Sequence, residues 1–152
     1  MIDEILYMEI RLLDLFCHNY DVSFVQANKL FNNFGIWNYI EECYDTLHMS
    51  GDEYILNSVT DILTAKGVQL IMKNGMILYL GSCAAIDKIR STANLILTMA
   101  IQDYSAKMNL SKAEVRNQMI ESGAYDALYD PETGLWTQGP DYFTDFFLRM
   151  KE

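Results

Sequence analysis

Few side chains in this sequence are suited to metal binding or acid–base chemistry. His48 could act as a general base near neutral pH, but no serine, cysteine or carboxylate accompanies it at a diagnostic spacing. A zinc site could in principle combine Cys17, His18, Cys43 and His48. Adjacent ligands on one helix point in different directions, and the sequence has no Cys-x-x-Cys pair, so we interpret the cysteines as ordinary thiols.

Four carboxylates near the C-terminal end form a second candidate site, and oxygen ligands of this kind suit a hard cation such as calcium. These residues are Asp126, Asp130, Glu132 and Asp141. Their spacing does not follow an EF-hand loop, so we expect a solvated acidic loop. The sequence therefore predicts neither a metal nor a cofactor.

Acidic side chains outnumber basic ones over most of the chain. The 152 residues carry 21 acids and 11 bases, a formal net charge of -10. Residues 1–66 hold 11 acids and 3 bases, residues 67–90 hold 1 and 3, and residues 91–152 hold 9 and 5. An acidic surface repels phosphate, which disfavours binding to DNA or RNA and favours a protein partner with a basic surface. Acidity can also simply keep a cytosolic protein soluble.

Aromatic side chains recur in the segments that we expect to form turns and short helices. Aromatic rings bury large areas with few rotatable bonds, so they can anchor protein interfaces, although they can equally cap the cores of helical units. The candidate partner-binding residues are Trp37, Tyr39, Tyr44, His48, Tyr125, Tyr129 and Trp136.

An internal repeat appears when the sequence is shifted on itself by 88 positions. The aligned identities are Ser23 with Ser111, Gly35 with Gly123, Leu47 with Leu135, Gly51 with Gly139 and Tyr54 with Tyr142. Serine is a good helix N-cap, and glycine adopts the left-handed backbone that often closes a helix. Glu114, three residues after Ser111, also fits a capping box.

The repeat predicts the order of the helices in each copy. Each copy should contain a long helix, a capped helix, a short turn-like helix, a loop and a closing helix. We therefore predict a mostly α fold with two similar helical units at residues 1–66 and 91–152. A short apolar linker, a strand or a turn, should join them at residues 67–90.

The segment from residue 22 to residue 54 resembles a small uncharacterised helical domain of bacteria. That family has the signature Leu-His-Thr-Gln-Gly followed shortly by tyrosine, and this chain has Leu47-His48-Met49-Ser50-Gly51 before Tyr54. The second copy has Leu135-Trp136-Thr137-Gln138-Gly139, with Trp136 in place of the histidine. Members of the family commonly lie beside genes for a domain of ADP-ribosyltransferase type. The resemblance therefore implies a toxin–antitoxin pairing or a related accessory role.

Residues 75–89 resemble the first strand of that transferase-like domain, in which the pattern is Leu-Tyr-His-Gly-Ser. The matching stretch here is Leu78-Tyr79-Leu80-Gly81-Ser82, so Leu80 replaces the histidine that contacts the NAD ribose in ADP-ribosyltransferases. A leucine cannot donate that hydrogen bond, and the match is far shorter than a transferase fold. We expect no NAD binding, and the segment is either a remnant of such a domain or an apolar linker.

These features favour a non-catalytic binding protein, antitoxin-like or inhibitory, that occludes a basic site on another protein. One alternative is a small hydrolase or transferase that uses His48 in an active site between the repeats. Another is a helix-turn-helix regulator at residues 23–43, but Lys29 is the only base in that stretch. No apolar run is long enough to span a membrane, and the first residues are acidic, so we expect a cytoplasmic protein.

Overall fold

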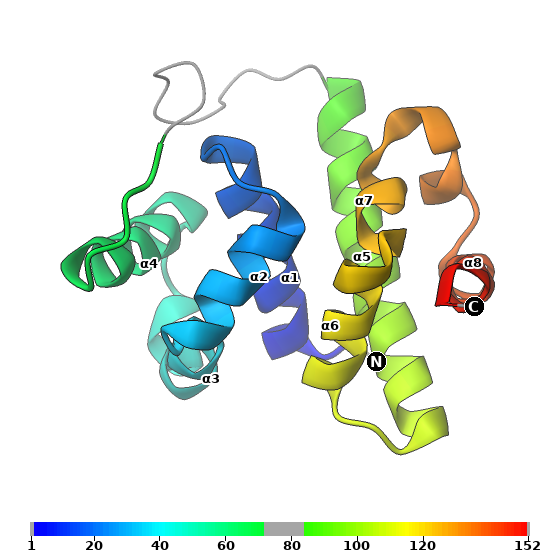
Figure 1. The fold of residues 1–152 in the computed structure, drawn as a ribbon, viewed down its shortest axis with the longest axis horizontal. Helices are drawn as coiled ribbons and strands as arrows, with labels where there is room; N and C mark the ends of the chain where they lie inside the picture. Colours follow the sequence, from blue (N-terminus) through cyan, green and yellow to red (C-terminus); the bar gives the residue numbers. More distant parts are fainter. Residues whose placement is uncertain (1, 72–83, 152) are drawn as a thin grey trace. The chain divides into compact units, whose positions relative to one another are not determined.

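The computed structural model describes residues 2–71 and 84–151, with the backbone alone at residues 84–87. Over these two ranges the chain forms eight α-helices and two short 3-10 helices and contains no β-strand (Figure 1). The predicted mostly α fold is confirmed. None of the helices in the described ranges combines the length and the apolar character needed to cross a bilayer.

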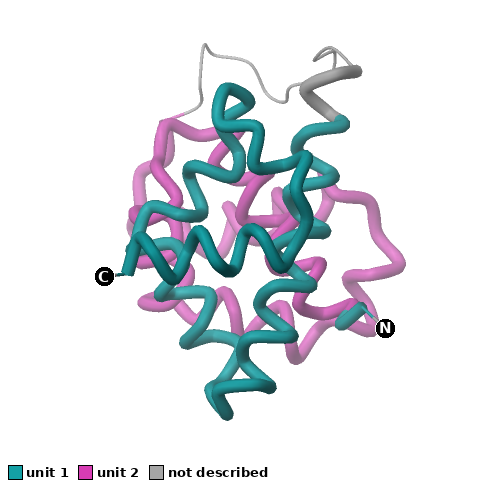
Figure 2. The backbone as a smooth tube through the Cα atoms, turned by 90° about the vertical axis from the view of Figure 1, so that its right-hand side faces the viewer, with its two compact units in different colours: residues 1–3, 82–152 teal, residues 4–81 magenta. Residues whose placement is uncertain are grey.

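The chain divides into two compact units, coloured differently in Figure 2. The N-terminal unit, residues 4–81, contains α1 (Glu4–Asn19), α2 (Phe24–Asn33), α3 (Ile36–Leu47) and α4 (Asp52–Ala65). The C-terminal unit, residues 1–3 and 82–152, contains α5 (Ala84–Met108), α6 (Lys112–Ser122), α7 (Ala124–Tyr129), η2 (Pro131–Thr133), η3 (Leu135–Thr137) and α8 (Pro140–Lys151). Asp3 belongs to the C-terminal unit because its N–H donates to Gln102 Oε1 at 2.7 Å and its carboxylate pairs with Lys112.

In the N-terminal unit, α1 packs against α2, α3 and α4. Phe31 of α2 lies edge-on to Phe16 of α1, with ring centroids 5.1 Å apart, and edge-on to Trp37 of α3 at 4.9 Å. Edge-to-face aromatic pairs add roughly 0.5–1.5 kcal/mol to the free energy gained from burial alone. These three rings therefore hold the first three helices of the unit together.

In the C-terminal unit, the long helix α5 packs against α6, α7 and α8. Tyr104 of α5 meets Phe147 of α8 edge-on, with ring centroids 5.7 Å apart. Phe143, one turn before Phe147, is also fully buried, so α8 contributes two phenylalanines to the core.

The helices of the two units begin in the same register. α2 and α6 start at residues 24 and 112, α3 and α7 at 36 and 124, and α4 and α8 at 52 and 140, a constant shift of 88 positions. Buried side chains recur at the same shift: Phe31 and Met119, Ile36 and Ala124, Ile40 and Leu128, Leu47 and Leu135, Ile55 and Phe143, Val59 and Phe147. The register found in the sequence thus also relates the helix starts and much of the buried set.

Both predicted capping serines cap their helices. The Ser23 hydroxyl accepts a hydrogen bond from the Gln26 N–H at 3.1 Å, and the Ser111 hydroxyl accepts one from the Glu114 N–H at 3.1 Å. The complete capping box forms at Ser23, whose N–H donates to Gln26 Oε1 at 2.9 Å. At the box predicted between Ser111 and Glu114, the structure contains the hydrogen bond that the Ser111 hydroxyl accepts.

Gly35 and Gly123 separate consecutive helices, at φ 70° and φ 90° respectively. Glycine adopts this left-handed backbone without the steric cost that a Cβ imposes. The second aligned glycine pair differs, because Gly51 has φ -75° whereas Gly139 has φ 111°. Identical residues in the repeat register therefore do not always share a backbone conformation.

The predicted linker at residues 67–90 is partly helical. α5 begins at Ala84, so residues 84–90 belong to that helix and do not form the predicted strand or turn. Neither glycine nor proline occurs from Ala84 to Met108, so the sequence contains no residue that would break the helix. Leu80 and the rest of the transferase-like match before Ala84 lie outside the described residues.

Candidate functional site

A set of polar and aromatic side chains in the N-terminal unit forms two groups, one that links α1 to α3 and one that links α1 to α4. We call this set the aromatic strip, and it consists of Glu4, Tyr7, Arg11, Tyr44, His48 and Asp52. Glu4, Tyr7 and Arg11 follow one face of α1, since residues three and four apart lie on the same side of a helix. Tyr44 and His48 lie at the C-terminal end of α3, and Asp52 begins α4.

Tyr44 is the central residue of the first half of the strip. Its hydroxyl donates to Glu4 Oε2 at 3.3 Å, and its ring stacks on His48 with centroids 4.9 Å apart and planes 11° apart. His48 Nδ1 lies 2.8 Å from the Tyr44 carbonyl oxygen. A carbonyl can only accept, so Nδ1 is the donor, and Nε2 of the neutral ring is left as an acceptor for a partner.

Arg11 is the central residue of the second half. Its guanidinium carbon lies 5.5 Å from the centroid of the Tyr7 ring, and its Nη2 lies 2.9 Å from Asp52 Oδ1. The side chains of Arg11 and Asp52 are 36% and 51% exposed, so water and salt screen this pair, and such pairs contribute about 0–1 kcal/mol. The pair positions side chains more than it stabilises the fold.

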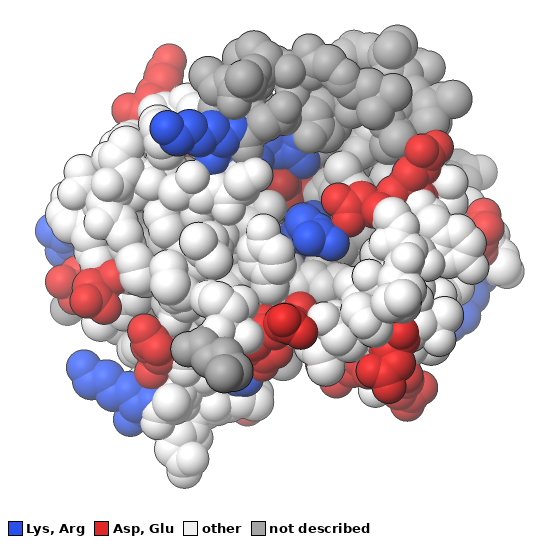
Figure 3. All heavy atoms as spheres, turned by 180° about the vertical axis from the view of Figure 1, so that it is seen from behind, with Lys and Arg blue, Asp and Glu red and all other residues white. Residues whose placement is uncertain are grey.

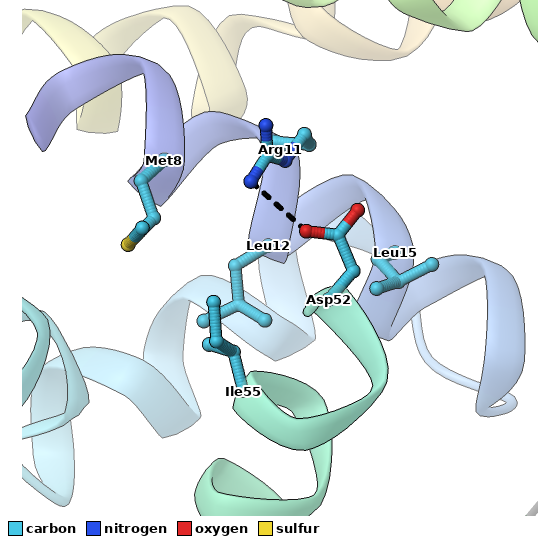
Figure 4. Close-up of a pocket in the computed structure, with 6 residues that line it drawn as sticks. All are labelled: Met8, Arg11, Leu12, Leu15, Asp52 and Ile55. Carbon is cyan, nitrogen blue, oxygen red and sulfur yellow. Dashed lines mark ion pairs between the residues drawn. The ribbon is translucent and has the colours of Figure 1, made fainter. Parts of the chain in front are cut away.

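A small cavity lies beside this ion pair, as Figure 4 shows. Apolar side chains of α1 and α4 line it together with the pair: Met8, Leu12, Leu15 and Ile55. Its volume of ≈ 10 Å³ is at the lower limit for a single water molecule. The cavity is therefore a packing defect and not a ligand pocket.

Two of the predicted contact residues lie in the core. Trp37 is 7% exposed and packs against Phe31, and Tyr125 is 0% exposed and lies 5.6 Å from Tyr129, between ring centroids. A ring buried this completely presents no surface to a partner. We therefore correct the predicted contact set by removing Trp37 and Tyr125 from it.

The remaining predicted residues keep some exposure. Tyr44 is half-buried and His48 is exposed, and the structure brings these two residues into direct contact. Tyr39 of α3 and Trp136 of η3 are half-buried. Tyr129 is half-buried as well, and its hydroxyl donates to Asn94 Oδ1, which ties it to α5.

The residues considered as metal ligands have other roles where the structure describes them. The Cys17 thiol donates to the Ser23 carbonyl oxygen at 3.7 Å, and the Asp130 carboxylate caps η2 by accepting from the Glu132 N–H at 3.0 Å. Within residues 2–71 and 84–151, no group of three or more His, Cys, Asp or Glu side chains could hold a metal ion. Desolvation raises the pKa of the Asp126 carboxyl above its ordinary value.

Several exposed residues are absent from the predicted contact set. Met49, next to His48, is 79% exposed, and Tyr54 and Tyr142 are 59% and 48% exposed at equivalent repeat positions. The identity of Tyr54 and Tyr142 in the 88-residue register was a signal that could have identified them. Met49 gave no such signal, because methionine is as often a core residue as a surface one.

The charges add to this picture. In the face shown in Figure 3, acidic side chains stand in small separate groups among uncharged surface. Glu4 and Asp52 place carboxylates at both ends of the aromatic strip, and Arg11 is its single base. The strip is therefore an aromatic centre with an acidic margin.

The geometry does not resemble an acid–base active site. The contacts described for His48 are to the ring and carbonyl of Tyr44. A histidine base normally needs a nucleophile within hydrogen-bond reach and a carboxylate that orients the ring. Glu4 bonds to Tyr44 and Asp52 pairs with Arg11, so both carboxylates of the strip are directed elsewhere.

One family model matches part of the N-terminal unit. No curated protein and no solved structure matches the chain. Residues 8–66 match the model of a family described as "Protein of unknown function (DUF3791)". The matched range contains four of the six strip residues: Arg11, Tyr44, His48 and Asp52. The N-terminal unit is thus similar to a small domain of uncharacterised function.

Proposed function

We propose that this protein is a non-catalytic binding module that attaches to a basic surface of another protein through the aromatic strip. The stacked Tyr44–His48 pair supplies a rigid aromatic contact with a free acceptor, and the neighbouring Met49 supplies adaptable apolar surface. The carboxylates of Glu4 and Asp52 stand at the margin, where charges mainly speed association and select a partner of opposite sign.

The observation that carries this proposal is the combination of exposure with order. Met49 and His48 are exposed, yet His48 is held by ring stacking and by a hydrogen bond. A side chain that is already ordered loses little further entropy when a partner binds. Exposed rings without such restraint would give a weaker contact.

An antitoxin-like or inhibitory role is the form of binding that we favour. The sequence resembles domains found beside ADP-ribosyltransferase-like proteins, and the strip would occlude a basic site on such a partner. We also propose that residues 91–152 are a second copy of the same domain, supported by the constant 88-residue shift between helix starts.

The proposal is tested by capture of a partner from the native host, followed by calorimetric titration of the purified pair. His48→Ala and Met49→Ala change exposed side chains, so the variants should fold like the wild type. Each should weaken binding, and the double variant should lose about thirtyfold in affinity, equal to about 2 kcal/mol.

Tyr54→Ala is the matched control, since it removes an exposed aromatic side chain of the same unit outside the strip. It should leave the affinity unchanged. If the His48 and Met49 variants bind like the wild type, or if Tyr54→Ala weakens binding as much as they do, the strip is not the contact surface.

A further inference from the structure

A groove in the C-terminal unit runs between α5 and α8 and has a volume of ≈ 410 Å³. The residues that line it are Asp103, Tyr104, Lys107 and Met108 of α5, and Asp141, Thr144, Asp145 and Leu148 of α8. On each helix these residues are one, three or four positions apart, so they mark one face of that helix. The groove therefore lies between the C-terminal end of α5 and the face of α8 from Asp141 to Leu148.

The apolar surface of the groove is partly open to solvent. Tyr104 is 7% exposed and is fixed edge-on against Phe147, which gives the groove a rigid base. Leu148 is 38% exposed and Met108 is 49% exposed, so both present apolar surface to water. Exposed apolar surface of this kind, rimmed by polar residues, is typical of a protein contact site.

The rim of the groove is strongly acidic. Asp103, Asp141 and Asp145 contribute three carboxylates, and all three residues are exposed. Lys107 is the single base among the lining residues. A positively charged ligand would therefore be attracted to the groove, whereas an acidic one would be repelled.

The positions that correspond to the exposed apolar residues of the groove are buried in the N-terminal unit. In the 88-residue register Tyr20 and Thr60 align with Met108 and Leu148, and they are 9% and 8% exposed. The exposed apolar surface of the groove is thus specific to the C-terminal unit.

We propose that the groove between α5 and α8 docks a short amphipathic helix of a partner protein, with leucine-like side chains against Tyr104 and Leu148 and with Lys or Arg side chains against the three aspartates. A helix bound between two helices contacts such a groove through side chains three and four residues apart. This inference goes beyond the proposed function, because it concerns the other unit and holds even if the aromatic strip binds nothing.

The test uses the full chain and two labelled synthetic peptides of about 15 residues, both with leucines at helical spacing. One peptide carries lysines on its flanks and the other carries glutamates. Fluorescence anisotropy should give the lysine peptide a Kd below about 100 μM, and the glutamate peptide should bind at least about tenfold more weakly.

Variants then locate the site. Leu148→Ser and the double change Asp141→Asn with Asp145→Asn should each weaken the lysine peptide about tenfold, since all three side chains are exposed and the fold should persist. Asp61→Asn, an exposed aspartate of α4, is the matched control and should leave the Kd unchanged.

Three results would overturn the proposal. The first is no binding of the lysine peptide up to about 1 mM. The second is equal binding of the two peptides, or equal effects of the Asp61 and groove variants. The third is displacement of the lysine peptide by spermine at matching concentration, which would assign the groove to small polyamines.

Discussion

In each unit the first helix packs against the last, but the side chains between these two helices differ. In the N-terminal unit the Arg11–Asp52 ion pair bridges α1 and α4, and the space beside it is nearly filled. In the C-terminal unit the equivalent positions hold Met99 and Pro140, and an acidic groove lies at other positions of α5 and α8, from Asp103 to Met108 and from Asp141 to Leu148. A shared framework therefore carries two distinct surfaces, and function must be sought in the exposed positions that differ.

The third helix of each unit also differs between the two units. α3 runs for 12 residues, whereas α7 ends after 6 residues and is followed by η2 and η3. Pro131 and Gly134 interrupt this stretch of the C-terminal unit, whereas the equivalent stretch of α3 contains neither residue type. Tyr44 and His48 stack at the end of the longer helix, and the C-terminal unit lacks the helix turn that would carry such a pair.

The largest effect should come from the buried aromatic pair that the register aligns. Trp37→Ala and Tyr125→Ala should each lower the free energy of unfolding by about 3–5 kcal/mol, because each leaves a cavity in a core. Urea denaturation followed by circular dichroism measures this loss. Tyr54→Ala, at an exposed position, should stay within about 0.5 kcal/mol of the wild type. A Trp37 variant as stable as the Tyr54 variant would contradict the core assignment.

The aligned glycines Gly51 and Gly139 should respond differently to alanine. A Cβ at either position meets no atom within 4 Å, so the difference depends on backbone conformation alone. Gly139→Ala should cost about 1–2 kcal/mol at φ 111°, whereas Gly51→Ala at φ -75° should cost nothing or stabilise the chain slightly. Thermal unfolding of the two variants separates the cases, and equal costs would mean that the two turns are alike.

A smaller effect is expected from the ion pair that distinguishes the units. Arg11→Met copies the residue of the C-terminal register and should lower the free energy of unfolding by less than about 1 kcal/mol. The loss should fade in about 1 M salt, where charges are screened within a few ångströms. A loss that is larger and independent of salt would show that Arg11 acts through packing of its aliphatic stem.

The smallest effect concerns Asp126. Desolvation raises the pKa of its carboxyl above the ordinary value of 3.8, so the charged form is disfavoured in the folded chain. Its contribution to the free energy of unfolding should therefore rise as the pH falls through the raised pKa toward 3.8. Asp126→Asn should stabilise the chain by less than about 0.5 kcal/mol at pH 7 and not at all below that range. An equal gain at both pH values would exclude the titration of Asp126 as the cause.

The helix starts could be predicted because their signals are local. Ser23 and Ser111 act on the amide three residues later, so the sequence alone locates α2 and α6. The extent of α5 could not be predicted in this way. Its first residues belong to the stretch that resembles the first strand of a transferase-like domain, and that resemblance favours a strand over a helix.

The candidate site was harder to predict because its contacts are distant in sequence. Trp37 and Tyr44 are seven residues apart on nearly the same face of α3, yet Trp37 meets Phe31 in the core whereas Tyr44 bonds to Glu4 at the surface. Helical periodicity cannot distinguish such residues. The Arg11–Asp52 pair likewise joins residues of two helices whose approach no spacing indicates.

Hydrogen exchange on the full chain, free and bound to the captured partner, tests the central claim most directly. Binding through the aromatic strip predicts new protection of the amides at the start of α1 and from the end of α3 to the start of α4, around His48, Met49 and Asp52. Protection should be unchanged around the exposed residues of α2. Protection confined to segments outside the strip, with the His48–Met49 turn exchanging as in the free chain, would contradict the account.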